Sequence, residues 1–384
     1  MTQLYITSAA AVGPLGTTLE EIWQKLLQGQ VAYSKAEINE KFYFVAETVE
    51  GSASKIHEYA PLFSQFIKKL ISSLNITETV DIIFFATAVG NLAEVESNIY
   101  KDIPLTTNFL DFASLEKYFH TTSVWGKNTR FVCIPTGCCS GIQAVGLAKK
   151  IMAQIDAKTG LIISVDFALT PLALEAFNKI NATCAYNHSI TSSPSRPFCK
   201  DRDGFLFADG GGAILVTTTV PQYSVPCITG YGCVSSAFHM TDIETDGRSI
   251  RESIKQALLD AGITGNLIDH INLHASGTKQ NDQAEYQALR DIIGYNLPMI
   301  TAFKANHGHA LGGANIIEIA LTWKMMMSRM VPPTANLLPV DAYPEVPPRI
   351  QSHLSDLNIV LKTASGFSGI HAAVIMEKFH DKNF

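Results

Sequence analysis

Short apolar runs alternate with amphipathic stretches along the first half of the chain. Residues 80–87 (VDIIFFAT) and 130–135 (RFVCIP) are continuous and mostly apolar, which is typical of strands buried on both faces. Residues 19–29 and 140–157 carry apolar side chains at helical spacing, and the first of these ends on a glycine. The pattern predicts further strands at 161–165, 213–217 and 225–228.

The same alternation returns in the second half. It predicts helices at 248–261, 283–293 and 314–327, and strands at 270–274, 298–303, 359–363 and 372–377. Strands that alternate with helices form parallel sheets covered by helices, so the fold class is α/β. We expect two similar α/β halves, residues 1–220 and 221–384, packed together as one body.

Three segments do not fit this pattern. Residues 91–128 and 171–212 are predicted to be irregular insertions. Residues 331–350 hold six prolines and are predicted to form a loop, because proline interrupts helices and central strands.

Composition narrows the class of protein. Hydrophobic residues make up 47% of the 384 residues, which is enough for a large core. The net charge of −6 argues against a nucleic-acid binder, and no uncharged apolar run is long enough to span a membrane. Residues 1–16 contain no Lys or Arg, unlike the start of a signal peptide, and the seven cysteines favour a reducing compartment. We therefore expect a cytoplasmic globular protein, and an enzyme.

The first candidate reactive group is Cys138, in the stretch Pro135–Gly141 (PTGCCSG). It lies between a predicted buried strand and a predicted helix, where free N–H groups and the helix dipole stabilise a thiolate. By itself the stretch fits equally well a pair of buried structural cysteines, Cys138 and Cys139.

Two further stretches follow predicted strands. His274 is followed by Ala275, Ser276, Gly277 and Thr278, which are small enough to border a cleft. Lys304 begins the segment KANHGHALGG, which contains two histidines, and Glu318 lies within the next helix. A metal site formed by His274, His307 and His309 is a weak alternative, because no carboxylate or cysteine has ligand spacing beside them.

These stretches, in this order, resemble the motifs of the β-ketoacyl synthases, the condensing enzymes with the thiolase-like fold. The resemblance covers the whole chain and rests on five motifs and a similar first strand. The matching segments are Thr136–Ser140, Arg196–Gly210, His274–Glu285, Lys304–Glu318 and Gly366–His371. The sequence departs from the family pattern where Ala275 and Ser276 replace Gly and Thr, Asp209 replaces Glu, Ser365 replaces Phe, and His371 replaces Asn.

The resemblance implies a layered α-β-α-β-α core and an acyltransferase activity. Cys138 would hold an acyl group received from an acyl carrier protein. His274 and His309 would support decarboxylation of malonyl-carrier protein, and the resulting carbanion would attack the acyl group. The resemblance assigns supporting roles to the following residues: Lys304 and Glu318 in the histidine network, Phe367 as a gate beside the nucleophile, and Thr278 and Ser276 on the pantetheine arm.

The resemblance also limits cofactors and partners. It implies no metal or organic cofactor, since the carrier protein brings its own phosphopantetheine. It implies a dimer, either of two copies or with a related ketosynthase-like chain, acting in fatty-acid or polyketide synthesis, with an aryl-polyene pathway as one option. The alternatives are a loading enzyme that transfers acyl groups without elongation, and a non-catalytic chain-length partner subunit. A thiolase is nearly excluded, because the last cysteine is Cys233 and a thiolase needs one near its C-terminus.

Overall fold

Two five-stranded half-sheets with the same strand order form the centre of the protein. The computed structural model describes residues 2–55, 58, 61–104, 112–188, 192–336 and 352–379. In the first half-sheet the spatial order is β5-β4-β6-β8-β1, with β1 (Leu4–Val12), β4 (Ile82–Ala86), β5 (Arg130–Ile134), β6 (Thr159–Asp166) and β8 (Gly210–Thr217). In the second it is β11-β10-β14-β15-β9, with β9 (Pro226–Ser235), β10 (His270–Asn272), β11 (Met299–Thr301), β14 (Ile359–Gly366) and β15 (Ile370–Lys378).

The two half-sheets join edge to edge. Strands β1 and β9 pair antiparallel through Leu4 with Ile228 and Tyr5 with Cys227, which makes one ten-stranded sheet. When the five strands of each half are numbered along the chain, their spatial order is 3-2-4-5-1 in both halves. The division at residue 220 stays a prediction, and it falls between β8 and β9.

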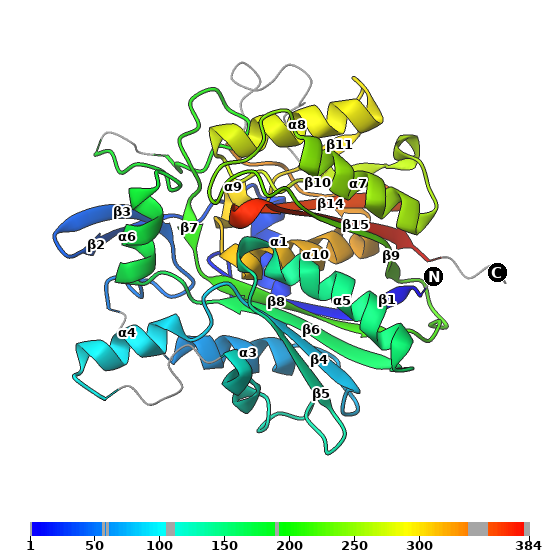
Figure 1. The fold of residues 1–384 in the computed structure, drawn as a ribbon, viewed down its shortest axis with the longest axis horizontal. Coiled ribbons are helices and arrows are strands. Elements are labelled where there is room, and N and C mark those ends of the chain that lie inside the picture. The colour runs from blue at the N-terminus through cyan, green and yellow to red at the C-terminus, as the bar shows by residue number, and fades with distance from the viewer. Residues whose placement is uncertain are drawn as a thin grey trace.

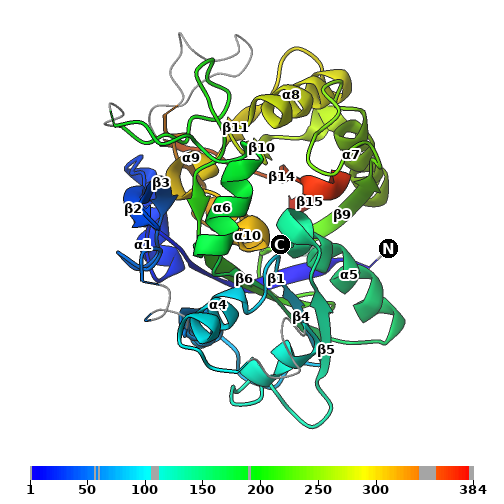
Figure 2. The ribbon, with the colours of Figure 1, turned by 60° about the vertical axis from the view of Figure 1, so that its left-hand side comes forward.

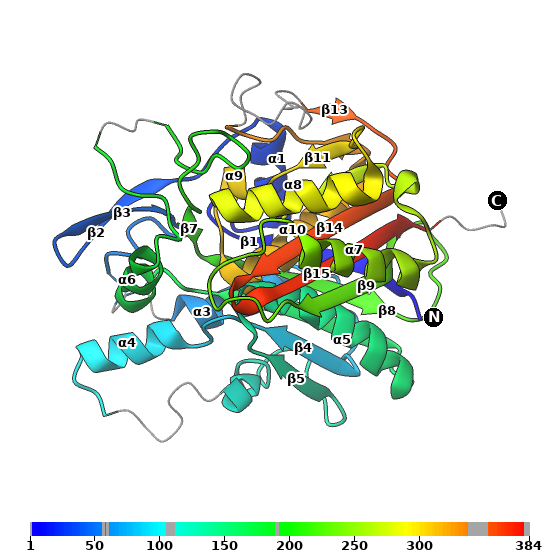
Figure 3. The same ribbon diagram turned by 45° about the horizontal axis from the view of Figure 1, so that its top comes forward.

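Helices form three layers around the half-sheets (Figures 1 and 3). Between the half-sheets lie α5 (Ser140–Gln154) and α10 (Leu311–Ser328), with α1 (Leu19–Leu27) packed on β1 and α10. Helix α3 (Leu62–Ser72) covers the outer face of the first half-sheet, and α7 (Arg248–Ala261) and α8 (Lys279–Ile293) cover the second. The fold is therefore the α-β-α-β-α arrangement predicted from the resemblance.

The alternation of side chains along the strands explains these layers. In β4 every residue is buried, with Phe84 packing into the core around α5 and α10 and Phe85 into the core around α3. Successive side chains of a strand point to opposite faces, so a strand covered on both sides reads as a continuous apolar run. Helix α10 is buried almost all round, which makes its single carboxylate, Glu318, an exception that needs cationic partners.

Smaller elements surround one end of the half-sheets (Figure 2). They are β2 (Ser34–Ile38), β3 (Lys41–Ala46), β7 (Phe207–Ala208), α4 (Leu92–Tyr100), α6 (Pro171–Lys179) and α9 (Lys304–His307). Two short strands, β12 (Met330–Val331) and β13 (His353–Leu354), pair with each other after the C-terminal end of α10. Helices α4 and α6 show that the prediction of wholly irregular insertions was wrong. The Thr170 side chain caps α6 by accepting from the Ala173 N–H, and a proline follows it at the first helical position.

Two further predictions concern the proline-rich segment and membrane spans. Residues 337–350 of the proline-rich segment lie outside the described residues. Within the described ranges, no helix combines the length and the apolar character needed to cross a bilayer.

Candidate active site

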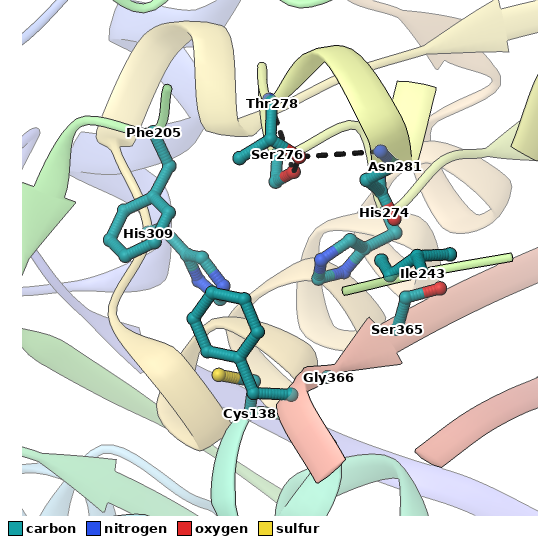
Figure 4. Close-up of a pocket in the computed structure, with 11 residues that line it drawn as sticks. Cys138, Phe205, Ile243, His274, Ser276, Thr278, Asn281, His309, Ser365 and Gly366 are labelled. Carbon is teal, nitrogen blue, oxygen red and sulfur yellow. Dashed lines mark hydrogen bonds between the residues drawn. The ribbon is translucent and has the colours of Figure 1, made fainter. Parts of the chain in front are cut away.

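One pocket brings the three predicted reactive groups together. Cys138, His274 and His309 line it, and Thr278 and Phe367 also form part of its wall (Figure 4). The thiol comes from the first half of the chain and both imidazoles come from the second. The residues of the predicted metal alternative do not form a cluster that could hold a metal ion, as far as the described part of the chain goes.

Cys138 lies in a 3-10 turn, Gly137–Cys139, directly before α5. The start of α10 packs against this turn, and Asn315 Nδ2 donates to the Cys138 carbonyl at 2.8 Å. The two helices approach so closely that a Cβ on Gly141 would lie 2.6 Å from the Gly312 carbonyl oxygen. Cys138 is 8% exposed, and its neighbour Cys139 is fully buried and donates to the Ile370 carbonyl at 3.3 Å.

The predicted stabilisation of a Cys138 thiolate by the helix start is opposed by burial in this site. Burial, together with the nearby Asp166 carboxylate, raises the pKa of the Cys138 thiol to about 11. The backbone N–H groups of Phe367 and Cys138 and the cation of Lys304 act in the opposite direction and lower that pKa. Desolvation of the anion exceeds the stabilisation by these dipoles. The resting site therefore holds a neutral thiol beside two backbone donors.

His274 and His309 face each other across the pocket (Figure 4). Their ring centroids lie 5.4 Å apart at 82°, and each ring is at most 3% exposed. Burial lowers the pKa of both imidazoles well below the usual value, and the cation of Lys304 lowers it further. Both rings are therefore neutral at pH 7. Among the described residues, Nδ1 of each ring has no hydrogen-bond partner.

The backbone at His274 is held from several sides. Glu285 accepts the N–H groups of His274 and Ala275 at 2.8 and 2.9 Å, and the Thr363 hydroxyl also accepts from His274 at 3.1 Å. Ala275 has φ 44°, in the left-handed region that favours glycine. The left-handed backbone conformation explains why the family pattern has a glycine at this position. In this chain the hydrogen bond from the Ala275 N–H to Glu285 helps to hold an alanine in that conformation.

Lys304 and Glu318 form a buried ion pair behind the histidines. Lys304 Nζ donates to Glu318 Oε1 at 2.8 Å and to the His274 carbonyl at 2.8 Å. A second buried lysine, which the sequence did not predict as a site residue, contacts the same carboxylate. Lys362 Nζ lies 2.7 Å from Glu318 Oε2. His307, in contrast, is buried 3.9 Å from Glu318 and does not line the pocket.

The remaining predicted residues lie at the pocket wall. Phe367 stacks on Phe177 at 6.1 Å between ring centroids, next to the nucleophile turn. The hydroxyl groups of Ser276 and Thr278 lie 3.1 Å apart, and Thr278 also caps α8 by accepting from the Asn281 N–H. The wall also contains residues that the analysis did not predict as site residues: Phe205, Ile243, Asn281, Ser365 and Gly366.

A thiol and two neutral imidazoles, held between two halves of equal strand order, define a thiolase-like condensing site. Family models for the N-terminal domain of β-ketoacyl synthases match residues 121–220, and those for the C-terminal domain match residues 225–338. The chain belongs to the β-ketoacyl synthase family, which consists of acyltransferases of the condensing type.

Relatives and solved structures agree with this assignment. The chain is 30% identical to the tetracenomycin polyketide synthase ketoacyl synthase alpha subunit of Streptomyces glaucescens, over 71% of this chain and 68% of that protein. It is 26% identical to the 3-oxoacyl-[acyl-carrier-protein] synthase 2 of Vibrio cholerae, over 98% of this chain and 99% of that protein. With a Streptomyces coelicolor polyketide relative, 33% identical, the match covers 54% of that protein.

Two solved structures show the same fold. A type II polyketide ketosynthase in complex with its acyl-carrier protein, AntDE:AntF, superposes with a TM-score of 0.85 at 24% identity, over 99% of this chain and 100% of that one. The ketosynthase ApeO of Xenorhabdus doucetiae, in complex with its chain length factor ApeC, gives 0.76 at 19% identity, over 98% of each chain.

Proposed function

We propose that this protein is a β-ketoacyl synthase that joins an acyl group held on Cys138 to a malonyl unit on an acyl carrier protein. The observation that carries this proposal is the meeting of the Cys138 thiol with two neutral imidazoles, His274 and His309, in one pocket. The family and its relatives support a role in fatty-acid or polyketide synthesis.

In the first step Cys138 sulfur attacks the carbonyl carbon of the acyl thioester. Because the resting thiol is neutral, its proton leaves as the new C–S bond forms, and the two neutral imidazoles that line the pocket are bases available to take it. The bond to the carrier sulfur then breaks, and the carrier thiolate receives that proton. The backbone N–H groups of Cys138 and Phe367, which lower the pKa of the Cys138 thiol, would donate to the carbonyl oxygen and stabilise the charge that develops on it.

In the second step His274 and His309 act on the malonyl group. Their N–H groups donate to the thioester oxygen, while the bond to the malonyl carboxylate breaks and CO₂ leaves. The electron pair of that bond becomes the carbanion, which attacks the acyl carbonyl and expels the Cys138 thiolate. Lys304 and Glu318 hold the His274 backbone in place during decarboxylation and carbanion attack, because Lys304 Nζ contacts both the His274 carbonyl and the Glu318 carboxylate. We propose that no metal or organic cofactor takes part.

The partners follow from this chemistry. We propose acyl carrier proteins as acyl and malonyl donors, and a dimer with a second copy or with a related chain. The roles of Thr278 and Ser276 on the pantetheine arm and of Phe367 as a gate stay predictions. All seven cysteines are free thiols, which fits a reducing compartment, and we propose the cytoplasm.

Intact-mass analysis with a panel of acyl-carrier proteins and malonyl-carrier protein tests the function. We expect an acyl adduct that maps to Cys138, followed by release of a product longer by two carbons. Cys138→Ala should lose the adduct, and Cys139→Ala, the neighbouring control, should keep it. Acylation without extension would indicate the loading enzyme, and no acylation from any carrier would indicate the partner subunit.

A further inference from the structure

The pocket is supported by a second buried lysine that the proposed reaction does not yet use. Lys362 lies in β14 and is fully buried, as is Glu318. Burying a lysine costs several kcal/mol unless its charge is paired, and apolar residues of similar size often replace such pairs without loss of stability. Its place in a fully buried part of β14 therefore calls for an explanation.

Lys362 completes a clamp around the carboxylate of Glu318. Lys304 contacts Oε1 at 2.8 Å, and Lys362 contacts Oε2 at 2.7 Å as an ion pair. Each lysine also reaches the end of β10: Lys304 Nζ donates to the His274 carbonyl at 2.8 Å, and Lys362 Nζ to the Leu273 carbonyl at 3.5 Å. The carbonyl groups of Leu273 and His274, which flank the N–Cα bond of His274, are thus each bound by a lysine that also contacts the Glu318 carboxylate.

The strand that carries Lys362 holds His274 a second time. Thr363, the next residue of β14, accepts the His274 N–H at 3.1 Å and donates to Glu285. Lys362 Nζ also donates to the Thr363 carbonyl at 2.6 Å, so the lysine fixes the residue that contacts His274. A shift of Lys362 would therefore reach the histidine backbone by two routes.

We propose that Lys362 is a positioning residue that holds His274 for the decarboxylation step. This inference rests on the proposed function and extends it to one residue. Lys362 contacts the backbone around His274 and not around His309. Either imidazole can take the Cys138 proton, whereas decarboxylation uses both, so loss of Lys362 should slow decarboxylation more than acylation of Cys138. A misplacement of a reacting group by about 1 Å costs on the order of 10²-fold in rate, so we expect a decrease of about 10- to 100-fold.

The charge of Lys362 also acts on the histidines. The titratable groups whose charge or contact reaches His274 are Lys304 (α9), Lys362 (β14), His309 (before α10), His371 (β15) and Glu285 (α8). Lys304, Lys362 and His307 (α9) act on His309, and Glu318 (α10) pairs with both lysines. The cations of Lys304 and Lys362 both lower the pKa of His274 and of His309. Replacing Lys362 by methionine removes one of them, so both pKa values should rise toward the ordinary 6.5.

The test compares Lys362→Met and Lys362→Arg in the full-length protein. Acylation of Cys138 and decarboxylation of malonyl-carrier protein are measured separately between pH 5 and 8. We expect Lys362→Met to lose decarboxylation selectively. The fall of its decarboxylation rate on the acid side of the pH profile should begin at a higher pH than in the wild type. Lys362→Arg should keep the wild-type profile. Lys149→Met is the matched control, because Lys149 is also a buried lysine paired with one carboxylate, Asp260, outside the pocket.

Equal loss of both half-reactions, or an unchanged acid limb in folded Lys362→Met, would overturn the proposal. If the methionine variant does not fold, Lys362→Gln, which keeps a donor without the charge, takes its place with the same expectation. Side-chain NMR titration of His274 and His309 reads the pKa without any turnover. A wild-type protein that neither acylates nor decarboxylates would refute the proposed function, whereas an active wild type with unshifted histidines in the variant would refute only this inference.

Discussion

At the scale of single residues, Cys138 shows two electrostatic effects in opposition. Backbone N–H groups and the start of α5 favour the thiolate, whereas burial and Asp166 disfavour it, and the pKa of about 11 shows that the second pair exceeds the first. Sulfur at this site is therefore unreactive until a substrate and a proton acceptor are both present. Such a site protects the thiol from adventitious reaction at neutral pH.

This balance predicts the pH dependence of Cys138 alkylation. Only the thiolate reacts, and at pH 7 a thiol of pKa 11 is ionised to about 1 part in 10⁴. The rate of iodoacetamide labelling at Cys138, followed by peptide mass mapping, should rise about tenfold for each pH unit between 7 and 9. A labelling rate that levels off below pH 8 would show that the pKa of Cys138 is lower and that the backbone N–H groups outweigh burial. The Cys138→Ala variant identifies any label on other cysteines.

The reactive residues could be predicted from the sequence, but most of their support could not. Cys138, His274 and His309 stand in motifs with characteristic neighbours, so local sequence finds them. Lys362 stands in a strand with no motif around it, and only its contact with Glu318, from a distant helix, reveals a role. Ile243 reaches the pocket through the fold of the loop before α7, which no local pattern records, whereas Ser365 stands beside the last family motif and could have been considered.

At the scale of elements, the starts of α5 and α10 are packed together by glycine. A side chain on Gly141 would meet the Gly312 carbonyl, and one on Gly312 would meet the Ser140 hydroxyl. This close approach sets the position of the nucleophile turn, because Asn315 in α10 holds the Cys138 carbonyl. The distance between the two helices is therefore part of the geometry of the site.

Replacing Gly141 by alanine tests this packing. The added Cβ would lie 2.6 Å from a backbone oxygen, which cannot move without shifting α10. We expect the free energy of unfolding to fall by about 1–3 kcal/mol, with a loss of Cys138 acylation. Urea denaturation measures the first effect. Gly13→Ala is the control, because its Cβ would have only Ile317 nearby, at 3.8 Å, and wild-type stability in Gly141→Ala would contradict the expectation.

The element pattern was predictable where burial is uniform. The continuous apolar runs 80–87 and 130–135 correspond to β4 and β5. Both faces of β4 are covered, as predicted, whereas β5 is the edge strand and most of its residues are only half-buried. The insertions were predicted less well. The Thr-Pro start of α6 was a signal that could have been used. Outside the insertions, helix α3 was not predicted, because Pro61 before it makes no side-chain cap and its N-terminus left little trace in the sequence.

At the scale of the whole molecule, the active site belongs to neither half alone. Helices α5 and α10 come from different halves and contact each other between the half-sheets, and the strand junction at β1 and β9 is only two residue pairs long. Most of the contact between the halves is therefore helix packing. Separation would expose the apolar faces of both central helices.

This arrangement predicts that the two halves do not fold independently. Residues 1–220 and 221–384, produced separately, should lack a cooperative thermal transition and should associate when produced together, restoring Cys138 acylation. Calorimetry and the acylation assay measure the two effects. A sharp unfolding transition from either half alone would contradict this expectation.

The order of the pocket residues along the chain also has a consequence for biosynthesis. Cys138 leaves the ribosome well before His274 and His309, and Phe367 follows only with the junction of β14 and β15. During translation the nucleophile therefore waits, without its imidazoles or its second backbone donor, until those last strands have emerged and paired. A polypeptide that ends before β14 would contain Cys138, His274 and His309 but would lack Lys362 and Phe367, and with them the second cation beside Glu318 and one of the two backbone donors near the thiol.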